Sequence, residues 1–189
     1  GSRSRTRIKN SDGRMDSDDI SMPNRLMLQY EFLEANKDIF ILGSWAIEFE
    51  DDINDPDNFI KKVPSKYSEI IEFYHYRNPL IHPTVIFRKN IFNIIGYYNE
   101  SFSSDQDLEL WGRCIKSNIG ISNIQQPLLY YNTNGIHIRR TKLKSIYNQI
   151  LARNLVPANS LKLKFLKFIA ICFRFMPKTI TQYGYRKLR

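Results

Sequence analysis

A continuous apolar run from Ile39 to Ser44 limits the fold more than any other feature, because it has the length of a buried strand. The segment before it carries apolar residues at helical spacing from Leu26 to Asn36, with Pro23 suited to the first helical turn and Ser21 to the N-cap. Residues 45–49 alternate and can extend the strand or form a partner strand. Strands that alternate with helices in this way predict an α/β fold.

The same alternation continues along the chain, and it predicts three regions. The further elements are helices beginning at Pro64 and Asp107, helices before and after Pro157, and strands at 80–87, 119–124 and 128–131. No strand is expected immediately before Arg14, where the residues are polar. Residues 1–13 are predicted to be a tag, a linker or a truncated remnant, residues 14–140 a domain, and residues 141–189 a basic helical region.

Charge is distributed unevenly within the net value of +9. Residues 1–110 hold 13 Lys and Arg against 19 Asp and Glu, whereas residues 111–189 hold 15 Lys and Arg and no acidic residue. Such a basic region needs an anionic partner, which leaves nucleic acid, a diphosphate substrate and anionic lipid open. The two cysteines, Cys114 and Cys172, form no CxxC pair, which argues against a disulfide scaffold or a cysteine zinc site and favours a reducing compartment.

The first cluster that could carry chemistry is Asp16-Ser17-Asp18-Asp19, between a turn signal and a predicted helix. Two carboxylates two positions apart can hold a divalent cation and leave coordination positions for phosphate oxygens. The alternative is that the acids cap the N-terminus of the following helix.

The second cluster surrounds Asp107, where a loop meets a predicted helix. Leu108 and Trp111 would anchor that helix to the core, so that the Asp107 carboxylate could project into a cleft as a general base. A helix N-cap is the alternative here too. His82, before the strand at 85–87, is either a structural residue or part of a site.

Four landmarks, spanning roughly residues 8 to 131, resemble the family 2 glycosyltransferases, and the bacterial capsule and exopolysaccharide enzymes of the amylovoran kind in particular. They are RMDSDDISMPNRL at residues 14–26, FILGS at 40–44, NPLIHPTVIFR at 78–88, and GYY at 96–98 followed by QDLELWGR at 106–113. Their common order makes the resemblance more specific than any single landmark. It implies a GT-A fold, a Rossmann-like mixed sheet flanked by helices, and an enzyme that transfers a sugar from a nucleotide sugar with inversion at the anomeric carbon.

On the donor side, the resemblance implies that Asp16 and Asp18 are the two acids of the DxD motif. Asp18 would bind Mn²⁺ or Mg²⁺ directly, Asp16 would face the ribose or the metal shell, and Arg25 would belong to the same cofactor-binding set. A UDP-sugar is the favoured donor.

On the acceptor side, the resemblance implies that Asp107 removes the proton from the acceptor hydroxyl. His82, Trp111 and Arg113 would shape the place where a saccharide or lipid-linked acceptor binds.

Two departures from the family pattern stand out. Only 15 mostly polar residues precede the DxD motif, where the family has strands and helices that bind the nucleotide base, and Tyr131-Asn132 stands where the family has YR. We therefore expect a partial GT-A fold in which residues 14–140 form the acceptor-side domain, inactive alone, with an unpaired sheet edge.

The region from Leu161 mixes Lys and Arg with aromatic residues and is too short and too charged to span a bilayer. It predicts either a helix at an anionic membrane surface or a helix docked on the domain. We expect a cytoplasmic protein, peripheral at the inner face of the membrane. A non-catalytic membrane scaffold is the alternative function, and a nucleic-acid-binding module is the less favoured one, since no such motif is visible.

Overall fold

The computed structural model describes residues 4–8, 11–134 and 143–175, which divide into two compact units. The described residues of the first unit are 4–8, 11–70, 79–96 and 119–134, and those of the second are 71–78, 97–118 and 143–175. Residues 71–78 and 97–118, from the predicted 14–140 domain, thus group with residues of the predicted C-terminal region.

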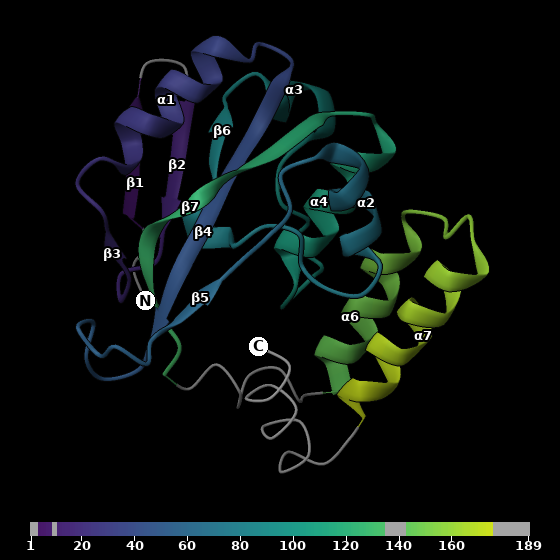
Figure 1. The fold of residues 1–189 in the computed structure, drawn as a ribbon. Coiled ribbons are helices and arrows are strands. Elements are labelled where there is room, and N and C mark those ends of the chain that lie inside the picture. Colours follow the sequence, from purple (N-terminus) through teal and green to yellow (C-terminus); the bar gives the residue numbers. More distant parts are fainter. Residues whose placement is uncertain (1–3, 9–10, 135–142, 176–189) are drawn as a thin grey trace. The chain divides into compact units, whose positions relative to one another are not determined.

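The first unit is built on a mixed sheet of seven strands (Figure 1). The strands are β1 (Ser4–Ile8), β2 (Ser11–Met15), β3 (Ile20–Ser21), β4 (Ile39–Phe49), β5 (Phe59–Lys61), β6 (Ile86–Arg88) and β7 (Gly120–Asn132). Their order is β1-β2-β6-β4-β7-β3, with β5 paired to β4. Strands β4 and β7 run parallel and the other pairs are antiparallel, so the predicted α/β class with a mixed sheet is confirmed.

Strand β4 is the predicted apolar run, extended to Phe49 by the alternating residues after it. Ile41 and Leu42 are fully buried, which explains why this segment reads as continuously apolar. Its pairing with β7 begins at Ile39 and Gly120 and ends at Phe49.

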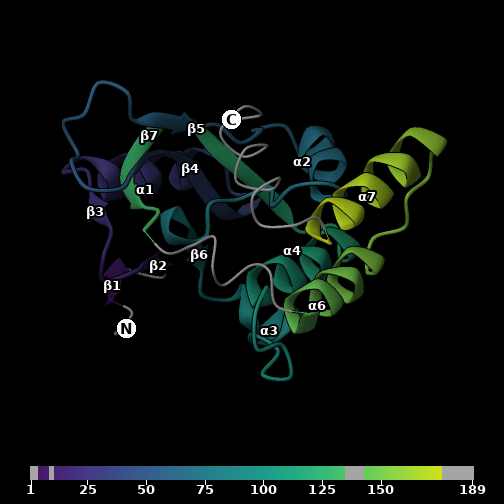
Figure 2. The same cartoon turned by 90° about the horizontal axis from the view of Figure 1, so that it is seen from below.

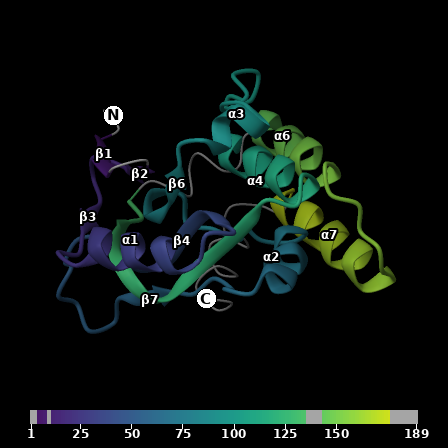
Figure 3. The same cartoon turned by 90° about the horizontal axis from the view of Figure 1, so that it is seen from above.

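Helix α1 (Arg25–Ala35) runs alongside β4 and β7 (Figure 3). Its residue Leu33 packs with Leu42 and Ile86 in a buried cluster. Arg88, the last residue of β6, donates from Nε to the Ile39 carbonyl at 2.8 Å and from Nη2 to the Leu33 carbonyl. A guanidinium therefore satisfies a carbonyl near the C-terminal end of α1.

The start of α1 differs from the prediction. The N-cap position is Asn24, whereas Ser21, predicted as the cap, lies in β3 and pairs with Leu129. Pairing with β7 takes the backbone of Ser21 into the sheet, so the N-cap lies three residues later than predicted.

Two sequence predictions about the extent of strands are wrong. The segment 80–87 is not one strand, because residues 82–84 form the 3₁₀ helix η1 and only Ile86 to Arg88 form β6. Pro83 favours the helical turn, and the Thr84 hydroxyl donates to the Ile81 carbonyl at 2.7 Å. The segments 119–124 and 128–131 are parts of one strand, β7.

Pro127 is tolerated inside β7 because it stands opposite Trp45, where the register with β4 shifts. A polar segment also forms a strand directly before the acidic cluster, contrary to prediction, since β2 pairs with β6 through Ser11, Asp12 and Gly13. The described part of residues 1–13 thus contributes strand residues on both sides of a hairpin.

The second unit is helical and includes α4 (Gln106–Lys116), α6 (Leu143–Asn154) and α7 (Leu161–Arg174), of which α6 and α7 lie side by side (Figure 2). The predicted stripe of Leu108, Trp111 and Ile115 on α4 is confirmed, because all three side chains are buried. Tyr74, in the last turn of α2 (Tyr67–Tyr74), donates its hydroxyl to the Ala152 carbonyl at 2.6 Å. That bond joins α2 residues to α6.

We predict that Gly120→Ala destabilises the sheet. A Cβ at this position would lie 2.1 Å from the Asp38 carbonyl oxygen, a backbone atom that cannot rotate away as a side chain would. The free energy of unfolding in urea should fall by about 1–3 kcal/mol. Ser68→Ala, at an exposed position of α2, is the control and should change it by less than about 0.5 kcal/mol. An unchanged stability of the Gly120 variant would show that β4 and β7 can separate at little cost.

Candidate functional site

Asp16 to Asp19 form a tight turn between β2 and β3. The Asp19 N–H donates to the Asp16 carbonyl at 3.3 Å, with Ser17 and Asp18 exposed and Asp16 half-buried. Because α1 begins only at Arg25, these acids do not cap a helix, and that alternative is wrong. Two carboxylates, those of Asp16 and Asp18, are presented on the turn.

Both ends of this turn are held by the sheet. Before it, the Arg14 N–H donates to the Val85 carbonyl at 2.8 Å. After it, Asp19 Oδ1 accepts from the Asn132 N–H at 2.9 Å, and the Met22 N–H donates to the Leu128 carbonyl at 3.0 Å. The carboxylates are therefore carried by a rigid scaffold rather than by a long loop.

Asp19 differs from its two neighbours because only 6% of it is exposed. Its Oδ2 atom is buried and accepts no hydrogen bond from the described residues. Burial raises the pKa of Asp19 from 3.8 to about 7, and repulsion from Asp16 and Asp18 adds to the rise, while the hydrogen bond from Asn132 opposes it. Asp19 is a structural anchor of the turn with an unsatisfied oxygen.

Arg25 lies inside the protein, with 2% of its surface exposed. Its Nη2 donates to the Arg14 carbonyl at 2.7 Å and its Nε to Gln29 Oε1 at 3.1 Å. Burial lowers the pKa of Arg25 to about 10, and the charge of Asp19 counteracts part of that shift. The structure thus places the Arg25 guanidinium against the strand that leads into the acidic turn.

The acidic turn fits a hard divalent cation by its donor chemistry. Asp16 and Asp18 offer carboxylate oxygens two positions apart on the same turn. Among the described residues no group of three or more His, Cys, Asp or Glu side chains converges on a metal position. Mg²⁺ in nucleotide sites is commonly held by one or two carboxylates, with phosphates and water as the other ligands, so two are enough.

Asp107 lies in the first turn of α4 in the second unit and is half-buried. Its Oδ2 accepts from Asn78 Nδ2 at 2.6 Å, and its Oδ1 has no hydrogen-bond partner among the described residues. The N-cap position of α4 is Asp105, so Asp107 is not the helix cap. The Asn78 amide therefore holds one of the two carboxylate oxygens of Asp107.

The loop that opens α4 is fixed by helix α6. Asp105 has a left-handed backbone, with φ at 58°, and its carboxylate accepts from Ser145 Oγ at 2.7 Å and from Gln149 Nε2 at 2.5 Å. Asn148 donates to the Ser104 carbonyl at 3.1 Å. We call these three α6 residues with Asp105 the Asp105 clamp; it holds a backbone conformation that costs energy two residues before Asp107.

The remaining predicted residues have well-defined positions. Trp111 is fully buried in the core of the second unit, and the Arg113 guanidinium forms two hydrogen bonds with the Glu109 carboxylate, at 2.8 and 3.0 Å. Arg113 also donates to the Tyr97 carbonyl at 2.8 Å. His82 is half-buried in η1, in the first unit with Asp16, Asp18 and Arg25.

Sequence reasoning missed the partners that position these residues. Asn78 was part of a recognised landmark, but its bond to Asp107 joins positions 29 residues apart. The role of Asp105 could not be recognised from the sequence, because its left-handed backbone is visible only in the fold. Asp19 was grouped with the other acids, although it alone is buried.

Comparison with known proteins shows similarity to glycosyltransferases, although no family model matches the chain. It is 40% identical over 117 residues to the UDP-Gal:alpha-D-GlcNAc-diphosphoundecaprenol beta-1,3-galactosyltransferase of Escherichia coli, covering 61% of this chain and 41% of that enzyme. It is 32% identical over 136 residues to the O-antigen biosynthesis glycosyltransferase WbnJ of Escherichia coli, which covers 70% of this chain and 50% of that protein. It is 28% identical over 116 residues to the amylovoran biosynthesis glycosyltransferase AmsE of Erwinia amylovora, which covers 61% of this chain and 42% of that protein.

These matches confirm the resemblance predicted from the four landmarks. The chain is homologous to glycosyltransferases, including enzymes named for the synthesis of bacterial polysaccharides. It spans half or less of the length of these three relatives.

We predict that Asp19→Asn changes the pH dependence of stability. The pKa of Asp19 in the fold, about 7, exceeds the reference value of 3.8, so the folded state binds the proton more tightly and loses stability as the pH rises from about 4 to 7. Asparagine keeps an oxygen for the Asn132 N–H but carries no charge. The free energy of unfolding of the variant relative to wild type should therefore rise by roughly 2–4 kcal/mol between pH 4 and 8.

Urea unfolding at several pH values, with a chelator present, measures this difference. Asp57→Asn, at an exposed position, is the control and should show no such trend. A constant difference between the Asp19 variant and wild type across this pH range would contradict the burial of a carboxyl with a raised pKa.

Proposed function

We propose that this chain is part of an inverting glycosyltransferase that moves a sugar from a nucleotide diphosphate sugar to an acceptor hydroxyl. The observation that carries the proposal is its homology to named glycosyltransferases, of which the galactosyltransferase of E. coli is 40% identical over the matched region. The turn that presents Asp16 and Asp18 and the half-free carboxylate of Asp107 support it. A UDP-sugar is the donor we propose, because that relative is named for UDP-Gal.

On the donor side, Asp16 and Asp18 would hold Mn²⁺ or Mg²⁺. When bound, the cation supplies positive charge that stabilises the nucleotide diphosphate as a leaving group. Asp19 and Arg25 hold the two ends of the turn. Asp19 fixes the end of the turn through Asn132, and Arg25 fixes the strand before it through the Arg14 carbonyl. In this proposal Arg25 acts by positioning the turn.

On the acceptor side, Asp107 acts as the general base. The acceptor oxygen attacks the anomeric carbon, the bond from that carbon to the diphosphate oxygen breaks, and the hydroxyl proton moves to Asp107 Oδ1. Asn78 holds Oδ2 and so fixes the direction in which Oδ1 points. The Asp105 clamp fixes the helix turn that carries the base.

The acceptor that we propose is a saccharide or a lipid-linked saccharide, since one relative is named for a diphosphoundecaprenol-linked substrate. A lipid-linked acceptor is anchored in a membrane. We therefore propose that the protein binds peripherally to the inner face of the membrane. Within the second unit, Trp111 and Arg113, the latter held by the Glu109 carboxylate, are the residues we propose to shape the acceptor side. His82, in the first unit, keeps its proposed acceptor role as a separate contribution.

We predict that Asp18→Ala weakens the binding of Mn²⁺ in the presence of UDP by at least about tenfold, because one of two carboxylate ligands is lost. Isothermal titration calorimetry of the purified chain, with Mn²⁺ added in the presence and absence of UDP, measures it. Asp57→Ala removes an exposed carboxylate elsewhere and is the matched control. Equal Mn²⁺ affinity of the Asp18 variant and wild type would remove the metal site from the acidic turn.

We predict that Asp107→Asn lowers kcat by about 100-fold or more in the complete protein, because the amide cannot accept the hydroxyl proton. It keeps the shape of the side chain and an oxygen for the bond from Asn78. Transfer assays with radiolabelled UDP-sugar measure turnover, and UDP titrations should show nearly unchanged nucleotide affinity. Near-normal kcat would show that another group removes the proton.

A further inference from the structure

Helix α7 exposes a stripe of large apolar side chains. Leu161 is 84% exposed, Phe165 63%, Phe168 64% and Ile169 45%, and none of the 14 residues of this helix is buried. Their spacing of four, seven and eight positions puts these side chains on one helix face. A contiguous apolar surface of this kind marks a place where a partner or a membrane binds.

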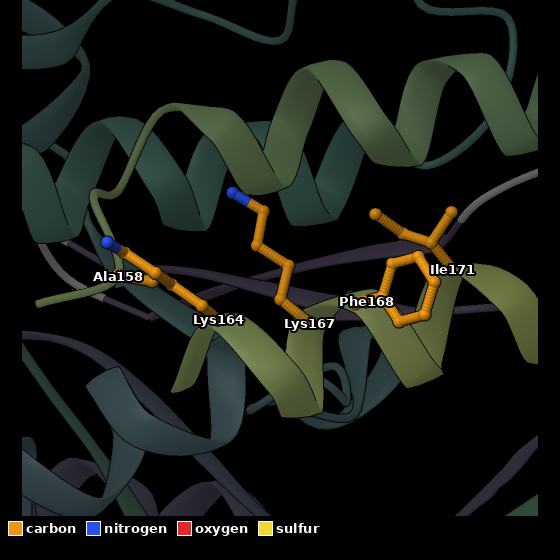
Figure 4. A pocket seen from close by; sticks show the side chains of 5 residues that line it. All are labelled: Ala158, Lys164, Lys167, Phe168 and Ile171. Carbon is orange, nitrogen blue, oxygen red and sulfur yellow. The ribbon is translucent and has the colours of Figure 1, made fainter. Parts of the chain in front are cut away.

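An open pocket adjoins this stripe (Figure 4). It is lined by Ala158, Lys164, Lys167, Phe168 and Ile171. In Figure 4 the side chains of Phe168 and Ile171 lie next to each other, and Lys167 stands to one side of them and points away from its own helix. The Lys167 ammonium group donates to the Arg153 carbonyl at 2.9 Å and to Asn154 Oδ1 at 2.6 Å, so α7 is fastened to the end of α6.

The charge on α7 restricts what can cover the stripe. Lys162, Lys164, Lys167 and Arg174 belong to this helix, and no acidic residue follows Glu109 anywhere in the sequence. A second copy of the chain on the same face would bring two basic helices together, which is repulsive. No helix in the described part of the chain has both the length and the hydropathy to cross a bilayer.

We propose that the face of α7 carrying Leu161, Phe165, Phe168 and Ile169 docks onto a membrane that contains anionic lipid. The apolar side chains would enter the boundary between headgroups and acyl chains, while Lys164 remains at the level of the lipid phosphates. Lys162 pairs with Glu72 at 2.6 Å and Lys167 with the end of α6, so these two lysines add to the electrostatic field of the surface without leaving their partners. Ser160 favours a helix that is already formed, because its hydroxyl accepts from the Leu163 N–H at 3.2 Å. The proposal names the surface behind the membrane association proposed above and stands whether or not the chain transfers a sugar.

Vesicle flotation of the purified chain tests this surface. The vesicles contain phosphatidylcholine alone or with phosphatidylglycerol, at low and at high salt. Wild type should bind the anionic vesicles more tightly than the neutral ones, and less tightly at high salt. Phe165→Ser combined with Phe168→Ser should weaken binding to anionic vesicles by at least about tenfold. Lys164→Glu should weaken it at low salt and much less at high salt.

The control is Met27→Ser combined with Ile94→Ser, which removes two side chains of 56% and 57% exposure from α1 and α3 (Ile91–Ile95). It should bind like wild type. Equal binding of wild type to neutral and anionic vesicles, no binding, or unchanged binding of both α7 variants would overturn the proposal. A concentration-dependent dimer in light scattering that the double Phe variant abolishes would assign the face to a second copy instead. Neither vesicle flotation nor light scattering depends on a sugar-transfer assay, so the membrane proposal can fail while the proposed function stands.

Discussion

The first unit depends on a chain of buried hydrogen bonds that begins at the Arg25 guanidinium. Gln29 accepts from it and donates through Nε2 to the Thr84 carbonyl at 2.7 Å. The Thr84 hydroxyl in turn accepts from the Ser44 N–H at 3.0 Å. A buried charge that loses a hydrogen-bond partner is costly. This series of hydrogen bonds therefore fixes β2, α1, η1 and β4 in a single arrangement.

This arrangement also fixes the position of the acidic turn, residues 16–19. The Arg14 carbonyl, which Arg25 holds, lies two residues before Asp16, and Asp19 is held on the other side by Asn132. Negative charge is gathered on a turn that cannot spread to relieve the repulsion. Crowded carboxylates that cannot move apart repel one another, and this repulsion costs stability.

The sequence motifs identified residues whose structural roles became visible only in the fold. Three residues of the landmark NPLIHPTVIFR form hydrogen bonds that position other elements. Asn78 binds the Asp107 carboxylate, Thr84 binds the Ser44 backbone, and Arg88 binds carbonyls of β4 and of the end of α1. Periodicity predicted α1 and α4, and a continuous apolar run predicted β4, although the buried side chains of α1 are Arg25, Gln29 and Leu33. These patterns could not predict β2, whose polar residues form a strand only because β6 pairs with them, or the continuity of β7 through Pro127, which depends on a register shift against β4.

The Asp105 clamp restricts how this protein can be divided. A left-handed backbone favours glycine, asparagine or aspartate, whereas the bonds from Ser145 and Gln149 require a short side chain that accepts twice. A truncated version that ended at residue 140 would lose both donors. The Asp105 carboxylate would then have no hydrogen bonds from α6 to hold its strained backbone at the start of α4. Helix α6 is therefore part of the framework that holds the start of α4, and a shortened version suited to crystallisation or fusion has to retain it.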